Sequence, residues 1–224
     1  MIQRLVCLAV GYLFGLFQTG YFVGLIKHRD IRNYGSGNSG TTNAMRVLGK
    51  KAGVMVFIGD FLKCVVACAL VKWAASRLGY VDERMVFLLY AGLGVILGHN
   101  FPFYLNFKGG KGIAASWGLS LMVDWRLGLV SIVIFILIVV LTKYVSLASM
   151  LATAAFAVMW FVLIAVDALE VPYGMIESGI LLVIVVTLAI VRHKGNIQRL
   201  IAGTENKIGQ KVKMPDEEKN SKKN

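Results

Sequence analysis

Residues 147–166 read LASMLATAAFAVMWFVLIAV, a run of 20 residues without a charged side chain. A helix of about 20 largely apolar residues is long enough to cross the hydrocarbon core of a bilayer. The rest of the chain is similar, since 57% of its 224 residues are hydrophobic and its mean hydropathy is +0.70. One water-soluble core cannot bury that much apolar surface, so the sequence predicts an integral membrane protein.

Other apolar runs lie on both sides of this one, and together they predict an all-α bundle of seven transmembrane helices. The run at residues 113–123 is short for a span. The first run lacks a small-residue cleavage site after it, so we expect a retained helix and not a signal peptide. The predicted spans are Leu5–Ile26, Val54–Trp73, Met85–Leu105, Ile113–Val123, Leu127–Leu141, Leu147–Val166 and Ile176–Val191.

The basic residues orient the predicted bundle, because lysine and arginine near helix ends tend to remain in the cytoplasm. With the N-terminus outside and the C-terminus cytoplasmic, 18 of the 24 lysines and arginines fall in cytoplasmic segments. The net charge of +12 is therefore explained by cytoplasmic loops rich in basic residues and by anionic ligands. No basic helix or aromatic patch indicates a nucleic-acid partner. We expect a multi-pass membrane protein.

The chain is predicted to form one transmembrane domain, residues 1–206, followed by a basic tail, 207–224. The tail has few apolar residues and is predicted to be disordered. The three cysteines lie in apolar runs and are expected to be buried thiols. No cluster of histidine, cysteine and carboxylate has the spacing of metal ligands, so we expect neither a metal nor a cofactor.

The first polar segment, residues 35–46, reads GSGNSGTTNAMR. Its glycines allow tight turns whose amide hydrogens can point at one anion, and its hydroxyl and amide side chains add donors. A helix capped by Thr42 or Asn43 would add partial positive charge, and Arg46 would offer a bidentate contact to phosphate. A flexible loop is the simpler alternative. The candidate residues are Gly35, Ser36, Gly37, Asn38, Gly40, Thr42, Asn43 and Arg46.

The second polar segment contains Lys108, Gly109, Gly110 and Lys111 directly before an apolar helix. The same reasoning predicts backbone amides and two cations around an anion. It is not a nucleotide-binding P-loop, because the spacing and the preceding strand are missing. The alternative is that the lysines only mark the membrane edge.

The third polar segment starts at His193. If the chain continues as a helix, His193 and Asn196 share one face. His99 is expected to satisfy the end of a helix near Pro102. Asp60 and Lys63 lie three residues apart within an apolar run, and we expect them to form an intramembrane ion pair with a structural role.

All three polar segments fall on the cytoplasmic side of the predicted bundle. Two membrane crossings separate the first from the second, and four separate the second from the third. An even number of crossings returns the chain to the same face, so the sequence predicts one composite site.

These motifs resemble the bacterial integral-membrane acyl-phosphate:glycerol-3-phosphate acyltransferases. The family pattern has a G-S-G-N-x-G-x-T-N-x-x-R loop, G-H-x-x-P leading into K-G-G-K-G, and H-x-x-N-I-x-R-L-x-x-G near the C-terminus. All three patterns stand in this chain in the same order, and the resemblance runs from the first helix to about Glu205. Ser39 and Thr41 depart from the family, which more often has an apolar residue and alanine there.

The resemblance implies transfer of a fatty acyl group from acyl-phosphate to the 1-hydroxyl of glycerol-3-phosphate, as the first acylation of bacterial phospholipid synthesis. The resemblance also implies five catalytic residues, which are Ser36, Arg46, Lys111, His193 and Asn196. The first loop would hold acyl-phosphate, while glycerol-3-phosphate would meet Arg46, Lys108, Lys111, Ser149, His193 and Asn196.

The general base is either His193 or the phosphoryl oxygen of the substrate. A transporter of a phosphorylated solute and a non-catalytic lipid-head-group scaffold are the alternative functions. The expected partners are the two substrates and the lipid bilayer, with no obligate protein partner evident.

Overall fold

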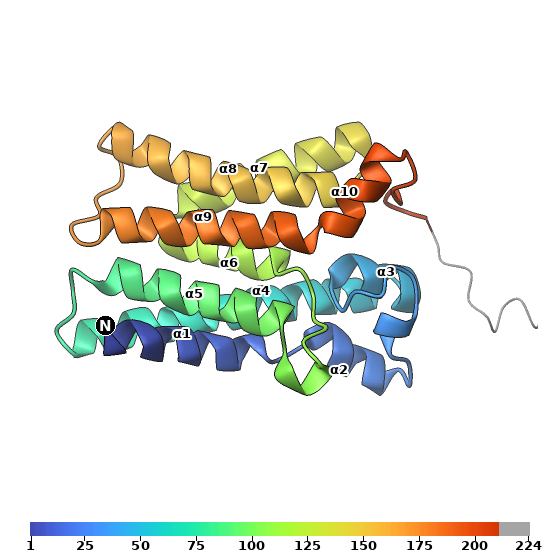
Figure 1. Ribbon diagram of the computed structural model, residues 1–224, viewed down its shortest axis with the longest axis horizontal. Helices are drawn as coiled ribbons and strands as arrows, with labels where there is room; N and C mark the ends of the chain where they lie inside the picture. The colour runs from blue at the N-terminus through green and yellow to red at the C-terminus, as the bar shows by residue number, and fades with distance from the viewer. Residues whose placement is uncertain (211–224) are drawn as a thin grey trace, which may run out of the picture.

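The computed structural model describes residues 1–210, which are helical with connecting turns (Figure 1). The predicted disorder of residues 211–224 lies outside the described residues. The helices are α1 (Ile2–Gly15), α2 (Thr19–Ile26), α3 (Thr41–Leu48), α4 (Lys50–Arg77), α5 (Arg84–Asn100), α6 (Ile113–Val123), α7 (Trp125–Thr142), α8 (Val145–Ala165), α9 (Met175–Arg192) and α10 (Lys194–Ile201). Two short 3-10 helices are η1 (Ile31–Asn33) and η2 (Phe103–Leu105).

Six helical segments within the described chain are long and apolar enough to span a membrane. The predicted all-α membrane architecture is therefore confirmed. The helix over residues 113–123 has 11 residues, fewer than a full span needs, so the count of seven spans stays a prediction. The six segments are Ile2–Ile26, Lys50–Arg77, Arg84–Leu105, Trp125–Thr142, Val145–Ala165 and Met175–Arg192.

The first span is broken between α1 and α2, although its apolar pattern predicts one continuous helix. The break leaves backbone carbonyl groups without their partners within the helix, and inside a membrane there is little water to bond to them. Gln18 Nε2 donates to the Gly15 carbonyl at 3.2 Å, and the Tyr104 hydroxyl donates to the Leu16 carbonyl at 2.7 Å. Lys63 Nζ donates to the Phe17 carbonyl at 2.8 Å. Hydropathy cannot show such a break, because the partners come from distant parts of the chain.

Glycines bring the α1 and α5 backbones into contact. A Cβ on Gly11 would lie 2.0 Å from the Ala91 carbonyl oxygen, and one on Gly94 would lie 2.2 Å from that of Leu8. Only small residues allow this approach. α4 also packs on α5, α7 and α8 pack together, and α6 contacts α4, α5, α7 and α8. In Figure 1, α3 and α10 lie at the end of the bundle opposite Met1.

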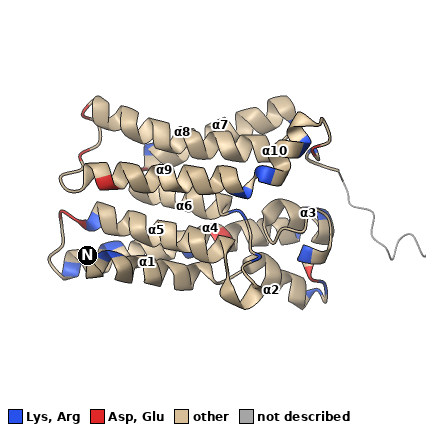
Figure 2. Ribbon diagram, viewed as in Figure 1, with Lys and Arg blue, Asp and Glu red and all other residues tan. Residues whose placement is uncertain are grey.

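The charged residues lie mostly at the two ends of the bundle (Figure 2). Near Met1, Arg4 and Glu177 form an ion pair of 2.6 Å that joins α1 to α9. Asp60 and Lys63 in α4 are buried inside the bundle, and the predicted pair is confirmed at 2.9 Å. The three cysteines are buried and free, as predicted.

Candidate active site

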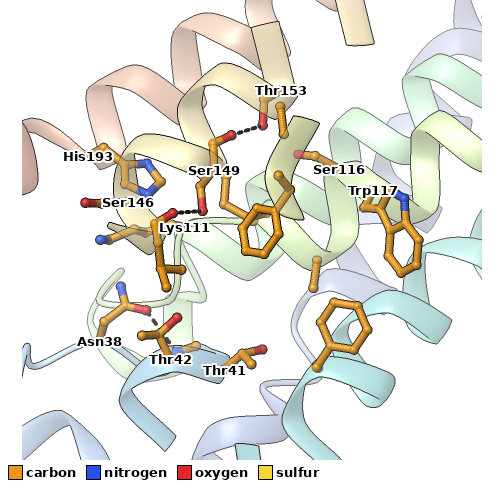
Figure 3. Close-up of a pocket in the computed structure, with 18 of the residues that line it drawn as sticks. Asn38, Thr41, Thr42, Lys111, Ser116, Trp117, Ser146, Ser149, Thr153 and His193 are labelled. Carbon is orange, nitrogen blue, oxygen red and sulfur yellow. Dashed lines mark hydrogen bonds between the residues drawn. The ribbon is translucent and has the colours of Figure 1, made fainter. Parts of the chain in front are cut away.

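The three polar segments meet in one pocket at the end of the bundle that carries α3 and α10. Figure 3 shows Asn38, Thr41 and Thr42 on one side of it, and Lys111, Ser149 and His193 on the other. Of the thirteen predicted site residues, Gly35, Gly37 and Lys108 do not line it. Those that do are Ser36, Asn38, Gly40, Thr42, Asn43, Arg46, Lys111, Ser149, His193 and Asn196.

Asn43 organises the first loop from inside. Its side-chain amide donates to the backbone carbonyls of Ile31, Tyr34 and Asn38 at 2.8, 3.1 and 2.9 Å, and its oxygen accepts from the Ser36 amide at 2.9 Å. Asn43 as a whole residue is 2% exposed. Asn43 thus holds the loop in shape, and its polar atoms are already engaged.

The start of α3 differs from the predicted cap. The cap residue is Gly40, without a side-chain hydrogen bond, and neither Thr42 nor Asn43 caps the helix. Asn38 Oδ1 instead accepts from the Gly40 amide at 2.9 Å. The cause is positional, because α3 begins at Thr41 and so leaves both candidates inside the first turn. The helix N-terminus still faces the pocket through Thr41 and Thr42.

The second loop does not form the predicted cradle of glycine amides. The Gly109 amide donates to the Asn100 carbonyl at 3.3 Å, and the Gly110 amide donates to the His99 carbonyl at 3.0 Å. These amides close the C-terminal end of α5. The glycines are needed for space: a Cβ on Gly109 would lie 2.0 Å from the His99 carbonyl oxygen, and one on Gly110 would lie 1.9 Å from His99 Nε2.

Arg192 holds the other side of this loop, although it was not among the residues predicted from the sequence. Its guanidinium donates to the Gly109 carbonyl at 3.1 Å and to the Gly110 carbonyl at 2.9 and 3.1 Å, and it lies over the Phe101 ring. The loop is therefore fixed through both its amides and its carbonyls. Lys111 follows this clamp and lines the pocket.

A chain of polar contacts crosses the pocket from Lys111 to Glu205. Lys111 Nζ donates to Asn196 Oδ1, and Asn196 Nδ2 donates to Glu205 Oε1 at 2.7 Å. Glu205 also accepts from Ser146 Oγ at 2.8 Å and Arg199 Nε at 2.7 Å. Glu205 and Ser146 were not predicted as site residues. The signal for Glu205 was a single carboxylate four residues after the last residue of α10, which is a basic helix.

The segment after α10 lies against the pocket, since Glu205 and Asn206 line it. The first residues of the predicted tail also make contacts there. The Ile208 amide donates to the Lys143 carbonyl at 2.8 Å, and Lys207 Nζ lies over the Tyr144 ring. Arg46 donates to the Asn206 carbonyl at 3.4 Å. Residues 207 and 208 therefore make defined contacts with the loop between α7 and α8.

The pocket perturbs its ionisable groups. Burial lowers the pKa of Lys111 to about 8, with Glu205 opposing that shift. Burial also lowers the pKa of Arg46. For Glu205, burial alone would raise the pKa, but hydrogen bonds from Asn196, Ser146 and Arg199 outweigh it, so the pKa is lowered and the group is a carboxylate.

His193 is neutral and its tautomer is fixed. Its Nδ1 lies 2.7 Å from the Ala189 carbonyl oxygen, which can only accept, so Nδ1 carries the proton. Nε2 keeps a lone pair, and the ring lines the pocket. Burial, followed by the charge of Lys111, lowers the pKa of His193 to about 4. With Asn196, the histidine lies on the pocket side as helical periodicity predicts.

The pocket continues between α4, α6, α7 and α8 as an apolar groove. Ser149 stands where the polar and apolar parts meet, and its hydroxyl donates to the Val145 carbonyl at 2.8 Å (Figure 3). The Thr153 hydroxyl donates to the Ser149 carbonyl, which leaves that wall effectively apolar. The apolar lining includes Phe57, Trp117, Ile132, Phe135 and Phe156.

The polar end of the pocket has two cations without a carboxylate partner. Among residues 1–210, no ion pair within 4.0 Å engages Arg46 or Lys111, whereas Glu205 is paired with Arg199 and Asp60 with Lys63. The described part of the chain has no group of three or more His, Cys, Asp or Glu side chains placed to hold a metal. The arrangement suits an anion with an attached apolar chain.

Comparisons with known proteins agree with this geometry. The sequence model of the family described as Glycerol-3-phosphate acyltransferase matches residues 5–203. A glycerol-3-phosphate acyltransferase of Thermoanaerobacter sp. (strain X514) is 40% identical over 92% of this chain and 96% of its own length. A glycerol-3-phosphate acyltransferase from Clostridioides difficile (strain 630) is 39% identical, over 94% of this chain and 98% of its own length.

Two solved structures have a similar fold. The glycerol 3-phosphate form of PlsY (YgiH), an integral membrane glycerol 3-phosphate acyltransferase, has a TM-score of 0.79 and 35% identity, covering 92% of this chain and 96% of its own. The lysophosphatidic acid form has a TM-score of 0.77 and 34% identity, covering 92% and 95%.

Proposed function

Since the chain belongs to the glycerol-3-phosphate acyltransferase family, we propose that it transfers a fatty acyl group from acyl-phosphate to the 1-hydroxyl of glycerol-3-phosphate. The products are 1-acyl-glycerol-3-phosphate, which is lysophosphatidic acid, and inorganic phosphate. This is the first acylation step of bacterial phospholipid synthesis. The protein would act in the cytoplasmic membrane with its pocket facing the cytoplasm.

The observation that carries this proposal is the junction of an apolar groove with two unpaired cations. An acyl chain can lie against Phe57, Trp117 and Phe156, within the part of the bundle that spans the bilayer. Its phosphate would then reach the polar end, where Ser36 and the N-terminus of α3 lie beside Arg46 and Lys111. A substrate that combines a long apolar chain with a phosphate matches both halves of the pocket.

The residues divide between the two substrates. The first loop, with Ser36 and the N-terminus of α3, would receive the phosphate of acyl-phosphate. Glycerol-3-phosphate would be held by Arg46, Lys111, Ser149, His193 and Asn196. Lys108 does not line the pocket, so its proposed role is to attract anions toward it.

The reaction needs no protein nucleophile, because acyl-phosphate is a mixed anhydride that is already activated. The 1-hydroxyl oxygen attacks the carbonyl carbon, and the bond from that carbon to the bridging phosphate oxygen breaks. Phosphate leaves with the electron pair, while the hydroxyl proton passes to a phosphoryl oxygen. Holding both substrates in line lowers the barrier by about 7 to 11 kcal/mol in favourable cases.

His193 fits a positioning role better than that of an essential base. Its unprotonated Nε2 can accept a hydrogen bond from the attacking hydroxyl. With a pKa of about 4, His193 is too weak a base to take that proton completely. A phosphoryl oxygen with a pKa near 6 is the stronger base. We therefore propose that the substrate takes the proton.

The direct test is an assay of purified protein in detergent with labelled glycerol-3-phosphate and either palmitoyl-phosphate or palmitoyl-CoA. Labelled lysophosphatidic acid should form from the phosphate and not from the CoA ester. Arg46→Ala should abolish the product, and Lys51→Ala, which removes an exposed lysine of α4 outside the pocket, should not. Binding of glycerol-3-phosphate without product would indicate a scaffold, and uptake into vesicles without acylation would indicate a transporter.

The orientation is testable separately. Cysteines placed at positions 36, 111 and 196 in a chain without its native cysteines should react with an impermeant reagent from the cytoplasmic side only. Labelling of these positions from opposite sides would contradict a single composite site.

A further inference from the structure

Ser116 of α6 carries a buried hydroxyl that the proposed mechanism does not use. The residue is 5% exposed and lines the pocket. Within residues 1–210 its hydroxyl has no hydrogen-bond partner, and its oxygen, unlike that of Ser178, is not completely enclosed by protein atoms. The pocket hydroxyls of α7 and α8 each donate to a protein oxygen at 2.8 or 2.9 Å, and they belong to Ser131, Ser146, Ser149 and Thr153.

Ser116 lies at the boundary between the polar and the apolar part of the pocket. α6 begins at Ile113 and α8 at Val145, and both of these residues line the pocket. A helix rises by about 1.5 Å per residue, so Ser116 and Ser149 each lie about one turn inside the start of their helix. Figure 3 shows Ser116 on the wall of the pocket across from Ser149.

The start of α6 adds partial positive charge beside this hydroxyl. The cap of the helix makes no side-chain hydrogen bond, and within residues 1–210 the amides of Ile113 and Ala114 donate to no acceptor. Unbonded amides at a helix N-terminus favour negative charge nearby. The indole of Trp117 donates to the Gly128 carbonyl at 2.9 Å and so holds this part of α6 against α7. Ser116 therefore stands on a fixed helix whose positive end lines the pocket.

An acyl-phosphate in this pocket offers the hydroxyl one suitable acceptor. A hydrocarbon chain cannot accept a hydrogen bond, so the acceptor must be an oxygen at the carboxyl end of the donor. In the proposed arrangement the phosphoryl oxygens lie with Ser36 and the N-terminus of α3. The carbonyl oxygen belongs to the first carbon of the chain and therefore lies at the boundary where Ser116 stands.

We propose that Ser116 is a further catalytic residue, whose hydroxyl donates a hydrogen bond to the carbonyl oxygen of acyl-phosphate. This inference rests on the proposed function. As the 1-hydroxyl oxygen adds to the carbonyl carbon, one electron pair of the C=O bond moves to the carbonyl oxygen, and it returns when the bond to the phosphate oxygen breaks. Ser116 keeps its proton throughout. Its hydrogen bond is stronger to the negative oxygen than to the neutral carbonyl, so it lowers the barrier.

Two serine substitutions in the same pocket test this role. Ser116→Ala should lower kcat with palmitoyl-phosphate about a hundredfold, which is the effect of removing one donor to a developing oxyanion. KM for both substrates should change little, because the interaction gains its strength in the transition state. Ser131→Ala is the matched control, since the hydroxyl of Ser131 is already bonded to the Leu127 carbonyl at 2.8 Å. It should keep the wild-type kcat.

Three kinetic results would overturn the proposal. The first is a wild-type kcat for Ser116→Ala. The second is an equal loss in both variants, which indicates a packing role. The third is a loss confined to a 3-hydroxyacyl-phosphate donor, which would mean that the hydroxyl binds a substituent of the chain and not the carbonyl. Size-exclusion profiles and melting temperatures of both variants control for misfolding.

A measurement of the bound carbonyl group does not depend on turnover. In a β-ketophosphonate analogue of palmitoyl-phosphate, CH₂ replaces the bridging oxygen, so the carbonyl remains but the acyl group cannot be transferred. The infrared stretch of its ¹³C-labelled carbonyl should lie at lower frequency in the wild-type protein and in Ser131→Ala than in Ser116→Ala, because a hydrogen bond weakens the C=O bond. Equal frequencies in all three proteins would contradict the contact. If the wild-type protein does not use palmitoyl-phosphate, the proposed function fails, but the carbonyl frequency still tests the contact with Ser116.

Discussion

The loop at residues 35–43 and the loop at residues 108–112 have similar glycine-rich sequences but are built in different ways. In the first, a side chain holds the backbone: Asn43 donates to three carbonyls and accepts from one amide. In the second, the backbone is bonded to the end of α5 and to Arg192, and its glycines are there for space. The two patterns look alike because glycine serves both purposes.

The difference shows what each loop can offer an anion. The second loop uses the amides of Gly109 and Gly110 internally, so its contribution to the pocket is the cation of Lys111. The first loop presents Ser36 and the N-terminus of α3 in a shape that one buried amide maintains. Substitutions in the two loops should therefore fail for different reasons.

The largest effect is expected for Gly109→Ala. Its Cβ would lie 2.0 Å from the His99 carbonyl oxygen, and a backbone atom cannot move aside without disturbing the end of α5. We expect little folded protein, measured as the monodisperse fraction in size-exclusion chromatography. The matched control is Gly37→Ala in the first loop, where φ is +68° and the nearest atom is 3.4 Å away. That change should cost about 1 kcal/mol, from the left-handed backbone alone. Equal yields for the two variants would refute the distinction.

Asn43→Asp is expected to have the second largest effect. A carboxylate of the same shape can still accept from the Ser36 amide but cannot donate to the carbonyls of Ile31, Tyr34 and Asn38. Unsatisfied buried groups cost about 1 to 3 kcal/mol each, so kcat/KM should fall at least about a hundredfold. Asn38→Ala removes only the bond to the Gly40 amide and should cost less than about tenfold. If Asn38→Ala were the more damaging change, Asn43 would not be the centre of the loop.

The sequence predicted the bundle and the meeting of the polar segments, because hydropathy and crossing parity act over the whole chain. It did not predict contacts between residues that are distant in the chain. The break after Gly15 depends on Lys63 and Tyr104, and neither leaves a mark in the local apolar pattern. Arg192 and Glu205 were not among the predicted site residues, because only the fold shows their partners.

Arg192→Lys tests the second loop with a smaller change. Lysine keeps the charge but is a point donor, and it cannot reproduce the planar contact with the carbonyls of Gly109 and Gly110. The loop should loosen and Lys111 should lose its fixed position. We expect KM for glycerol-3-phosphate to rise about tenfold, from the loss of one to two hydrogen bonds. Arg32→Lys, in an ion pair with Asp30 away from the pocket, is the control. An unchanged KM would show that Arg192 does not position Lys111.

The smallest effect is expected from pH, and it tests whether the second loop acts mainly through one cation. Burial lowers the pKa of Lys111 to about 8, so this group loses its proton as pH rises through that value. Between about pH 7 and about pH 8.5, the protonated fraction falls about fourfold, and kcat/KM for glycerol-3-phosphate should fall with it. The substrate phosphate is already a dianion over most of this range, since its second pKa is near 6.

In Lys111→Arg, whose guanidinium stays charged, activity is lower but the decline above neutral pH should be absent. The rates are measured with saturating palmitoyl-phosphate and corrected for its spontaneous hydrolysis at each pH. A wild-type profile that stays flat to about pH 9 would mean that backbone amides, and not Lys111, supply the positive potential of this loop.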